Sequence, residues 1–351
     1  MEKINLLMTG AGAPGAPGII KCLQKMNWIN LIVGDMNKLS SGRFLNNKKF
    51  IKLMPAEDSN YVKNTIKLCK ENNIKIIFPL VTKELFVLSK FKNEFLDAGI
   101  KVIVSDNSTL EIANNKLKLY KHLYKNNIEV PKFYEVKSFE DIKKMSKKFN
   151  YPNNPFVLKY GPGNGSRAIR IFDEKSDLFD KFMNEKPNNL FTDLDNFKKV
   201  LGNNRLENFF VMEHLPGNEV TIDTVIKSGE IIVELIRNRT KINSGISVAG
   251  EFIEDKNLSK KVKEIVSVLN LEGNIGFQFK LDSDNNYQLI EMNPRIQGTS
   301  IASIGMGINL PELALLSQLD RDYKIPDTSK KIGFIRYYEE VFYDLESDKK
   351  K

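Results

Sequence analysis

The sequence predicts an α/β protein that begins with a doubly wound parallel sheet. In the first part of the chain, short apolar segments of strand length alternate with segments of helical periodicity. Because strands that alternate with helices favour parallel pairing through crossover connections, this order predicts one α/β domain over residues 1–107. The strands are expected at residues 4–8, 31–33, 74–78 and 100–104, and the helices at 19–26, 60–71 and 83–95.

The composition is that of a chain with two or three ordinary domains. The chain has 351 residues, and it contains no run of 18 apolar residues, so no membrane span is expected. It starts directly with a strand pattern, and no signal peptide is expected. Cys22 and Cys69 lie in helical patterns and are expected to be reduced. Together these features predict a cytoplasmic protein.

The formal net charge of +9 is spread over lysine-rich helices. A basic chain can bind nucleic acid, but no cluster of aromatic and arginine residues and no nucleic-acid-binding motif is present. We therefore expect no nucleic-acid partner. His122 lies in a helical pattern without clustered ligands, which gives no support for a zinc site.

A glycine-rich turn after the first strand matches a dinucleotide-binding fingerprint. Gly10, Gly12 and Gly15 have the G-x-G-x-x-G spacing, and Asp35 ends the next strand. Glycines are also expected at any strand-to-helix turn near an anion. An NAD-dependent enzyme therefore stays open as a weaker alternative, beside a substrate-binding turn and a purely structural one.

A second glycine-rich segment lies between two predicted strands, at residues 155–159 and 168–172. The first strand ends in a lysine, and the backbone amides of the loop that follows can fold over phosphate groups. It is not a Walker A loop, because it leads into a strand and lacks Gly-Lys-Ser/Thr. A flexible hairpin with a lysine there by chance is the alternative. The candidate residues are Lys159, Gly163, Gly165 and Ser166.

Candidate residues also flank a predicted hairpin of strands 220–226 and 230–236. Before it, an apolar strand runs into Glu213, His214, Leu215 and, after a Pro-Gly turn, Glu219. After it, strand alternation places Arg237 and Arg239 on one face, where two guanidinium groups facing a cleft would suit an anionic substrate or a phosphorylated intermediate. A solvated edge strand is the alternative.

The strongest chemical signal is the segment 287–295. Its alternation is that of a strand, so Glu291 and Asn293 share one face. Pro294 ends the strand because it cannot donate to the ladder, and Arg295 follows. A carboxylate beside an amide oxygen suits Mg²⁺, and a guanidinium just beyond suits a phosphate oxygen. A hairpin with an ordinary polar face is the alternative.

Gln278 lies on the predicted strand that precedes this segment. A hairpin loop of four residues would set Gln278 opposite Glu291, whereas a loop of five would turn it to the other face. The first alternative predicts three oxygen ligands from one hairpin, namely Gln278, Glu291 and Asn293.

With Gln278 and with Glu-Met-Asn-Pro-Arg at 291–295, the sequence resembles the ATP-grasp superfamily, in pattern nearest to its carbamoyl-phosphate-synthase-like branch. The resemblance extends from Met1 to about Leu319. It implies a pre-ATP-grasp N-terminal domain followed by an ATP-grasp fold with a mobile lid. The implied segments are the N-terminal domain at 1–107, the first ATP-grasp part with the lid at 108–212, the second part at 213–330, and a C-terminal strand and basic tail at 331–351.

The resemblance also implies the nucleotide contacts. In the family, a basic residue before a helix and a lysine before the lid reach the ATP phosphates, and Lys116 and Lys159 match them. The backbone of Glu213, His214 and Leu215 would pair with the adenine edge, and Glu219 would accept hydrogen bonds from the ribose hydroxyls. Asn115, just before the first lysine, departs from the family's usual aspartate.

The metal and the phosphoryl group are assigned in the same way. Glu291 would bridge two Mg²⁺ ions, or Mn²⁺ in their place, with Gln278 on one and Asn293 on the other. Many family members have a carboxylate where this chain has Gln278. Arg295 would stabilise charge on the transferred phosphoryl group.

The resemblance implies an ATP-dependent ligase that joins a carboxylate to an amine through an acyl phosphate and releases ADP and phosphate. An ATP-grasp phosphotransferase and a carbamoyl-phosphate-synthase-like subunit that acts with a partner stay open as alternatives. The expected partners are ATP and small-molecule carboxylate and amine substrates, without a membrane. A homodimer is an open alternative to a monomer.

Overall fold

The computed structural model describes residues 3–46, 49–163, 168–185, 190–243 and 245–345. It divides the chain into two compact units. Unit 1 is Met1–Glu111, Val220–Phe277 and Asn293–Lys351, and unit 2 is Ile112–Glu219 and Gln278–Met292. The Gly165 and Ser166 candidates and the basic tail after residue 345 lie outside the described residues.

The N-terminal sheet in unit 1 is parallel and doubly wound, as predicted. Its strand order is β3-β2-β1-β4-β5, and every neighbouring pair is parallel. The short β3 was not predicted, because only one of its three residues is buried. The strands are β1 (Ile4–Thr9), β2 (Ile29–Asp35), β3 (Phe50–Lys52), β4 (Ile74–Phe78) and β5 (Lys101–Val102).

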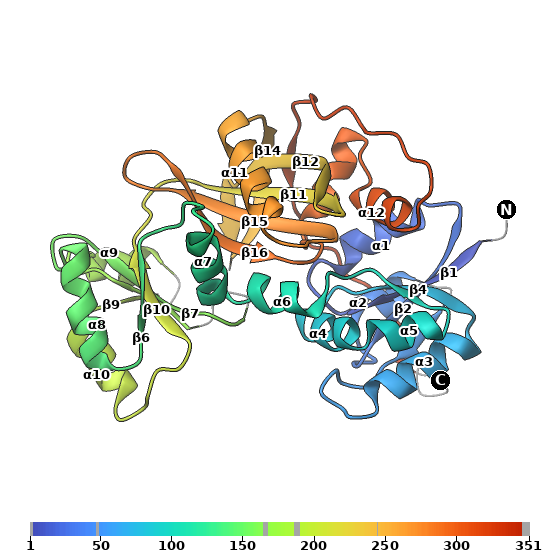
Figure 1. The fold of residues 1–351 in the computed structure, drawn as a ribbon, viewed down its shortest axis with the longest axis horizontal. Coiled ribbons are helices and arrows are strands. Elements are labelled where there is room, and N and C mark those ends of the chain that lie inside the picture. Colours follow the sequence, from blue (N-terminus) through green and yellow to red (C-terminus); the bar gives the residue numbers. More distant parts are fainter. Residues whose placement is uncertain (1–2, 47–48, 164–167, 186–189, 244, 346–351) are drawn as a thin grey trace. The chain divides into compact units, whose positions relative to one another are not determined.

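Helices cover both faces of this sheet (Figure 1). Side chains of β1 alternate between the two, because Leu6 and Met8 pack with α1 (Ala16–Gln24) and Leu7 packs with α3 (Tyr61–Glu71). The predicted helix at 83–95 is two helices with a break at Phe91. The remaining helices here are α2 (Ser41–Leu45), α4 (Thr82–Lys90), α5 (Lys92–Asp97) and α6 (Asn107–Ala113).

Unit 2 is built on a second sheet, with the order β6-β10-β7-β8-β9. One of its faces packs against α8 and α10, through Ile142, Phe197 and Leu201, and the other packs against α7. The elements are α7 (Lys116–Lys125), β6 (Phe133–Val136), α8 (Phe139–Ser146), η1 (Lys147–Phe149), β7 (Phe156–Tyr160), β8 (Ile169–Phe172), α9 (Leu178–Asn184), β9 (Phe191–Thr192), α10 (Leu194–Leu201) and β10 (Phe209–Glu213).

The third sheet has the order β13-β14-β12-β11-β15-β16, with β17 beside β14. β15 and β16 run from one unit into the other. The C-terminal strand expected within 331–351 is only three residues long, because pairing ends at Ile335 and the aromatic side chains beyond it are exposed. The elements are β11 (Glu219–Lys227), β12 (Glu230–Asn238), β13 (Lys241–Asn243), β14 (Ile246–Ile253), α11 (Lys256–Ser267), β15 (Gly273–Leu281), β16 (Tyr287–Asn293), η2 (Ser300–Met306), α12 (Leu310–Gln318) and β17 (Gly333–Ile335).

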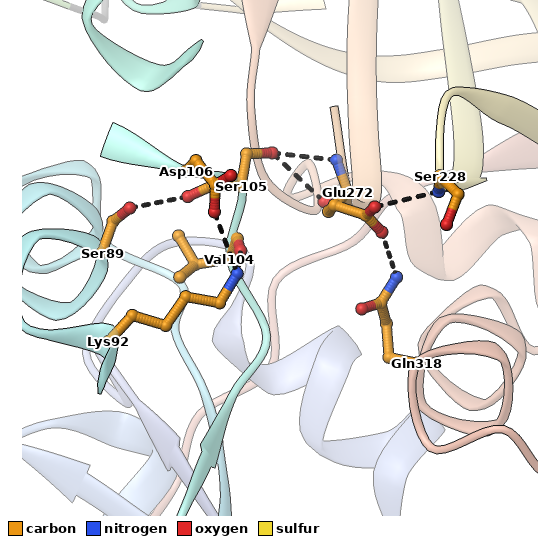
Figure 2. Close-up of polar contacts among 8 residues, drawn as sticks. All are labelled: Ser89, Lys92, Val104, Ser105, Asp106, Ser228, Glu272 and Gln318. Atoms are coloured by element: carbon orange, nitrogen blue, oxygen red, sulfur yellow. Dashed lines mark hydrogen bonds and ion pairs between the residues drawn. The ribbon is translucent and has the colours of Figure 1, made fainter. Parts of the chain in front are cut away.

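Glu272 ties the N-terminal sheet to the C-terminal segments within unit 1 (Figure 2). Its carboxylate accepts the backbone N–H of Ser228 at 2.9 Å and the amide of Gln318 at 2.5 Å. Its own backbone N–H donates to Ser105 Oγ at 2.9 Å, and the carbonyl of Ser105 accepts from Ser89 Oγ at 2.7 Å. Through its side chain and its backbone, Glu272 therefore connects three segments that are distant in sequence, and Ser105 extends the connection to Ser89.

Among the described residues, no single helix has the length and apolar character of a membrane span. The pair Ser300–Met306 and Leu310–Gln318, bent by 99°, meets that test only when its two helices are taken together, by length and composition alone.

Glu84 is the most deeply buried carboxylate at the edge of the N-terminal sheet. Its Oε2 accepts from Thr9 Oγ1 at 2.6 Å and its Oε1 from Tyr61 Oη at 3.3 Å. Burial raises the pKa of Glu84 from 4.5 to about 7, although both hydrogen bonds oppose the shift and Asp35 adds to it. The folded chain therefore holds this proton more tightly than the unfolded chain does.

We expect Glu84→Gln to remove a pH dependence of stability. Between pH 4.5 and 7 the folded state binds more protons at Glu84 than the unfolded state, so the free energy of unfolding falls as pH rises. The shift corresponds to about 3 kcal/mol over that window. Urea denaturation at a series of pH values checks this, with exposed Glu254→Gln as the control. An unchanged slope in Glu84→Gln contradicts the assignment.

Candidate functional site

Lys116 lies in the first turn of α7, in unit 2, and two acceptors hold its ammonium group. Its Nζ donates to the carbonyl of Gly163 at 2.8 Å and lies 3.7 Å from Oε1 of Glu291. Only 11% of the lysine side chain and 20% of the glutamate side chain are exposed. Desolvation makes such a pair stronger than a surface ion pair. The structure thus brings together residues predicted from three separate motifs.

Asn115 stands where the resemblance implies an aspartate, and its contacts show why an asparagine can replace it. Its Oδ1 accepts the backbone N–H groups of Leu117 and Lys118, both at 3.1 Å, so it is the N-cap of α7. The backbone N–H of Lys116 donates to the carbonyl of Gly161 at 2.8 Å. A Cβ on Gly161 would lie 2.5 Å from Asn115 Oδ1, so the loop can approach the cap only with glycine there. The cap needs an acceptor oxygen, which either residue supplies.

Lys159 is buried in β7, with 9% of its surface exposed. Burial, followed by repulsion from Lys116, lowers the pKa of Lys159 to about 8, and the carboxylates of Glu291 and Glu219 oppose the shift. Two neighbouring ammonium groups in a buried setting repel each other unless an anion joins them. The pair therefore favours a ligand with several negative charges.

An apolar wall lies beside these charges. Tyr120 is fully buried in it, and its Oη donates to the carbonyl of Leu289 at 2.7 Å, which ties α7 to β16. Sequence reasoning missed Tyr120, although its position four residues after Lys116 sets it one turn along the same helix face. The buried members of the wall are Leu117, Tyr120, Val157, Phe210, Met212 and Leu215, with Ile290 partly buried against them.

The segment expected to pair with the adenine edge runs from Glu213, the last residue of β10, to Leu215. The backbone N–H of Glu213 donates to the carbonyl of Lys132 at 3.0 Å, and its Oε1 accepts the N–H of Lys132 at 2.6 Å. Leu215 is 3% exposed and belongs to the apolar wall. Burial lowers the pKa of His214, and the neighbouring charge of Lys280 adds to this shift.

Glu219 lies at the start of β11, and its Oε1 is 4.0 Å from Nζ of Lys280 on β15. Sequence reasoning missed Lys280, which was one lysine among many. Its place two residues after Gln278, on the same strand, was the available signal. Of the lid candidates, Gly163 is described and has a φ of 96°, which favours glycine.

Five residues, 282–286, lie between β15 and β16, so the loop of four residues is wrong and the alternative loop of five is the one present. The N–H of Asp282 donates to the carbonyl of Asn286 at 2.9 Å, and Asn285 has a φ of 61°. The reason is local, because Asp282 Oδ1 also accepts the N–H groups of Asp284 and Asn286, at 2.9 and 2.8 Å. An aspartate that binds the backbone ahead of it tightens the turn.

This register changes the place of Gln278. Continued along both strands without a bulge, it sets Gln278 opposite Ile290, one position from Glu291. Gln278 therefore stays a candidate through the resemblance and not through direct pairing. Across the described part of the chain, no three His, Cys, Asp or Glu side chains gather into a metal-ligating group. A cation here would depend on Glu291 as its carboxylate.

Asn293 and Arg295 belong to unit 1. Nη1 of Arg295 donates to the carbonyl of Ile296 at 2.9 Å, and Nη2 lies 3.4 Å from Oδ1 of Asn293. Its Nε lies 3.5 Å from Oγ1 of Thr82, at the start of α4. The backbone of its own loop therefore holds the guanidinium group.

The prediction that Arg237 and Arg239 face one cleft is wrong. Arg237 is 0% exposed, and its Nε donates to Asp223 Oδ2 at 2.8 Å. β12 ends at Asn238, so strand alternation does not extend to Arg239, whose Nε donates to Ser247 Oγ at 2.8 Å. A buried carboxylate on the neighbouring strand draws the first arginine inward, which the sequence pattern did not reveal.

Other segments of the chain contact the glycine-rich turn after β1. The N–H of Gly12 donates to Asp35 Oδ2 at 2.7 Å. A Cβ on Gly15 would lie 2.3 Å from the Cα of Gly298, so this turn packs backbone to backbone on the loop after β16. A dinucleotide fingerprint needs the same turn and the same carboxylate for its ligand. The contacts therefore do not favour the NAD alternative.

Two family models match parts of this chain. Residues 205–340 match the model described as ATP-grasp in the biosynthetic pathway with Ter operon. Residues 6–103 match the model described as the PylC-like N-terminal domain. The second match coincides with the doubly wound sheet, and the first contains the third sheet.

Curated relatives point in the same direction. The carbamoyl phosphate synthase large chain of Clostridium acetobutylicum is 25% identical over 228 residues, which are 62% of this chain and 20% of that protein. The corresponding large chain of Pyrococcus furiosus is 21% identical over 238 residues, 65% of this chain and 21% of that protein. This chain thus spans about a fifth of the length of these relatives.

Solved structures are similar in fold over nearly the whole chain. N5-carboxyaminoimidazole ribonucleotide synthetase in its ADP complex has a TM-score of 0.72 at 13% identity, and the match covers 95% of this chain and 82% of that one. Biotin carboxylase from Campylobacter jejuni has a TM-score of 0.68 at 16% identity, and the match covers 94% of this chain and 73% of that one. The chain therefore has an ATP-grasp domain with a PylC-like N-terminal domain.

Proposed function

We propose that this chain is an ATP-dependent ligase that joins a carboxylate to an amine and releases ADP and phosphate. The observation that supports this best is the cluster of Lys116, Lys159 and Glu291 beside the apolar wall of unit 2. An apolar cluster next to two buried ammonium groups suits a nucleotide, which has an aromatic base and a chain of phosphates. Among the similar solved structures, the N5-carboxyaminoimidazole ribonucleotide synthetase is an ADP complex and the biotin carboxylase is a β-γ-ATP complex.

In this proposal the nucleotide takes over contacts that the chain makes with itself. Lys116 would leave the carbonyl of Gly163 and bind a phosphate oxygen, and Lys159 would bind a second phosphate. The base would lie on the apolar wall with its edge at the Glu213 to Leu215 backbone. Glu219, which lies 4.0 Å from Lys280, would accept from the ribose.

The carboxylate of Glu291 suits Mg²⁺ that arrives with the nucleotide. Mg²⁺ usually needs only one or two protein carboxylates, since phosphates and water fill its other positions. Glu291 would be that carboxylate, and Gln278 and Asn293 would add amide oxygens. Bound there, the metal would neutralise charge on the phosphates. Two ions, Mg²⁺ or Mn²⁺, are what we infer from the resemblance.

The chemistry itself asks little of the protein beyond positioning. A carboxylate oxygen of one substrate attacks the γ-phosphorus, the bond to the β-phosphate oxygen breaks, and ADP leaves with an acyl phosphate formed. The amine then attacks the acyl carbon and expels phosphate. Arg295 would neutralise charge on the transferred group, a role worth about 10³-fold or more in rate in other phosphoryl-transfer enzymes.

The first test is ADP and phosphate release with Mg²⁺, screened over amino acids and small carboxylates with hydroxylamine as a generic amine. We expect one acid to give a hydroxamate. If ADP forms without phosphate or hydroxamate, the chain is a phosphotransferase and the ligase proposal is wrong. Nucleotide binding without turnover would indicate a subunit that needs a partner, in keeping with the length of the carbamoyl phosphate synthase relatives.

Glu291→Ala is expected to lower ADP formation by about 10³-fold, because the metal contributes several kcal/mol to phosphoryl transfer. Circular dichroism should show that the variant is folded, since the side chain is partly exposed. The matched control is Asp284→Ala, an exposed carboxylate at the tip of the same hairpin. Wild-type turnover in folded Glu291→Ala would overturn the metal assignment.

The affinity for Mg·ADP is expected to fall about tenfold between pH 7 and pH 9, because Lys159, with its pKa of about 8, loses its charge over this range. Isothermal titration calorimetry measures it. Lys159→Met should bind more weakly at pH 7 and lose most of the pH dependence, whereas Lys118→Met, exposed on α7, should behave as the wild type. A flat wild-type profile would contradict the role of Lys159.

A further inference from the structure

Asp223 is the centre of a buried polar network in unit 1 that the proposed chemistry does not use. It lies on β11, 4% exposed, and its Oδ2 accepts from Arg237 Nε at 2.8 Å. Its Oδ1 accepts from Ser300 Oγ at 2.6 Å and from Gln297 Nε2 at 3.0 Å. Both carboxylate oxygens are thus engaged, and two of the three donors come from the loop after β16.

Glycine residues allow this loop to pack closely against its neighbours. A Cβ on Gly276 of β15 would lie 2.1 Å from the amide of Gln297, so the glycine makes room for that side chain to lie on the sheet. On its other side, the loop approaches Gly15 at Gly298, where a Cβ would also clash with backbone. The loop is therefore held between the third sheet and the turn after β1, and Asp223 supplies its directional bonds.

Besides its bond to Asp223, the guanidinium group of Arg237 lies over the ring of Phe334, 5.7 Å from its centroid. Its side chain is 0% exposed, and in the described part of the chain Nη1 and Nη2 have no hydrogen-bond partner. Burying those donors costs free energy, so the arginine is not explained by its hydrogen bonds alone. Its positive charge neutralises a carboxylate that would otherwise be buried unpaired. Arg237 therefore makes an ionised Asp223 tolerable inside the sheet.

The network reaches Arg295 through the same loop. Gln297 follows Arg295 by two residues, and the carbonyl that accepts from Arg295 Nη1, at 2.9 Å, belongs to Ile296 between them. A shift of Gln297 would consequently move the acceptor that orients the guanidinium group. A misplacement of about 1 Å can cost 10²-fold in rate.

We propose that Asp223 and Arg237 are positioning residues, which fix the 295–300 loop and thereby aim Arg295 without touching either substrate. This inference rests on the proposed function for the role of Arg295. The claim that these residues fix the loop depends only on the contacts described above. Hydrogen exchange of the loop tests that claim, and turnover tests the role of Arg295.

Hydrogen–deuterium exchange tests the loop in the full chain without substrates. In Asp223→Asn we expect peptides that cover residues 293–306 to exchange at least about tenfold faster, while peptides of unit 2 and the affinity for Mg·ADP are unchanged. Asp255→Asn, which alters the N-cap carboxylate of α11, is the control and should leave residues 293–306 unaffected. Unchanged exchange of this loop in Asp223→Asn would overturn the proposal, whether or not the chain turns over ATP.

Turnover tests the link to Arg295 by a double-mutant cycle. We expect Asp223→Asn to lower kcat about 10²-fold with KM for ATP within about twofold, and to add little in an Arg295→Ala background. Arg237→Lys, which keeps the charge, should retain most of kcat. The proposal is overturned if each of the two variants, Arg237→Lys and Asp223→Asn, lowers kcat as much in the Arg295→Ala background as it does in the wild-type background. A wild-type chain without ATP turnover would instead overturn the proposed function, and the exchange result would still decide on the loop.

Discussion

The burial of two lysine side chains beside one glutamate is the constraint on which unit 2 depends. Lys116 and Lys159 repel each other, and the carboxylates of Glu291 and Glu219 only partly oppose that repulsion. Leaving cations so close together in a buried setting is unfavourable, and a ligand with several negative charges relieves it. The apolar wall beside them keeps water out and makes the same interaction stronger once the ligand is bound.

The constraint in unit 1 is the close approach of backbone segments to one another. Gly15 meets Gly298, and Gly276 makes room for Gln297, at distances that no Cβ would allow. Each glycine raises the conformational entropy of the unfolded chain, so its use has to be offset by contacts that it permits. Here those contacts connect the turn after β1, the loop after β16 and the buried carboxylate of Asp223. A glycine pattern that resembles a cofactor fingerprint is thus occupied by the chain's own packing.

Where sequence reasoning went wrong, a single local interaction was the cause. One aspartate, Asp282, binds two backbone N–H groups ahead of it within the five-residue β15–β16 loop, and the resulting register sets Gln278 opposite Ile290 rather than Glu291. One buried carboxylate, Asp223, draws Arg237 into the sheet and away from the cleft expected for it. Both carboxylates were visible in the sequence, but neither has a spacing that distinguishes it from an exposed one.

The sequence by itself determined the parallel N-terminal sheet, because period-two and helical patterns are properties of neighbouring residues. Turn and strand patterns also made Lys159 and Glu291 candidates for phosphate and metal, whereas Lys116 became a candidate only through the resemblance to a family. Only the tertiary structure decided which of them meet. The 3.7 Å between Lys116 and Glu291, the fully buried state of Arg237 and the low pKa of Lys159 depend on segments more than ten residues apart. Pairing over such separations is decided by packing and desolvation, which leave no periodic pattern in a single sequence.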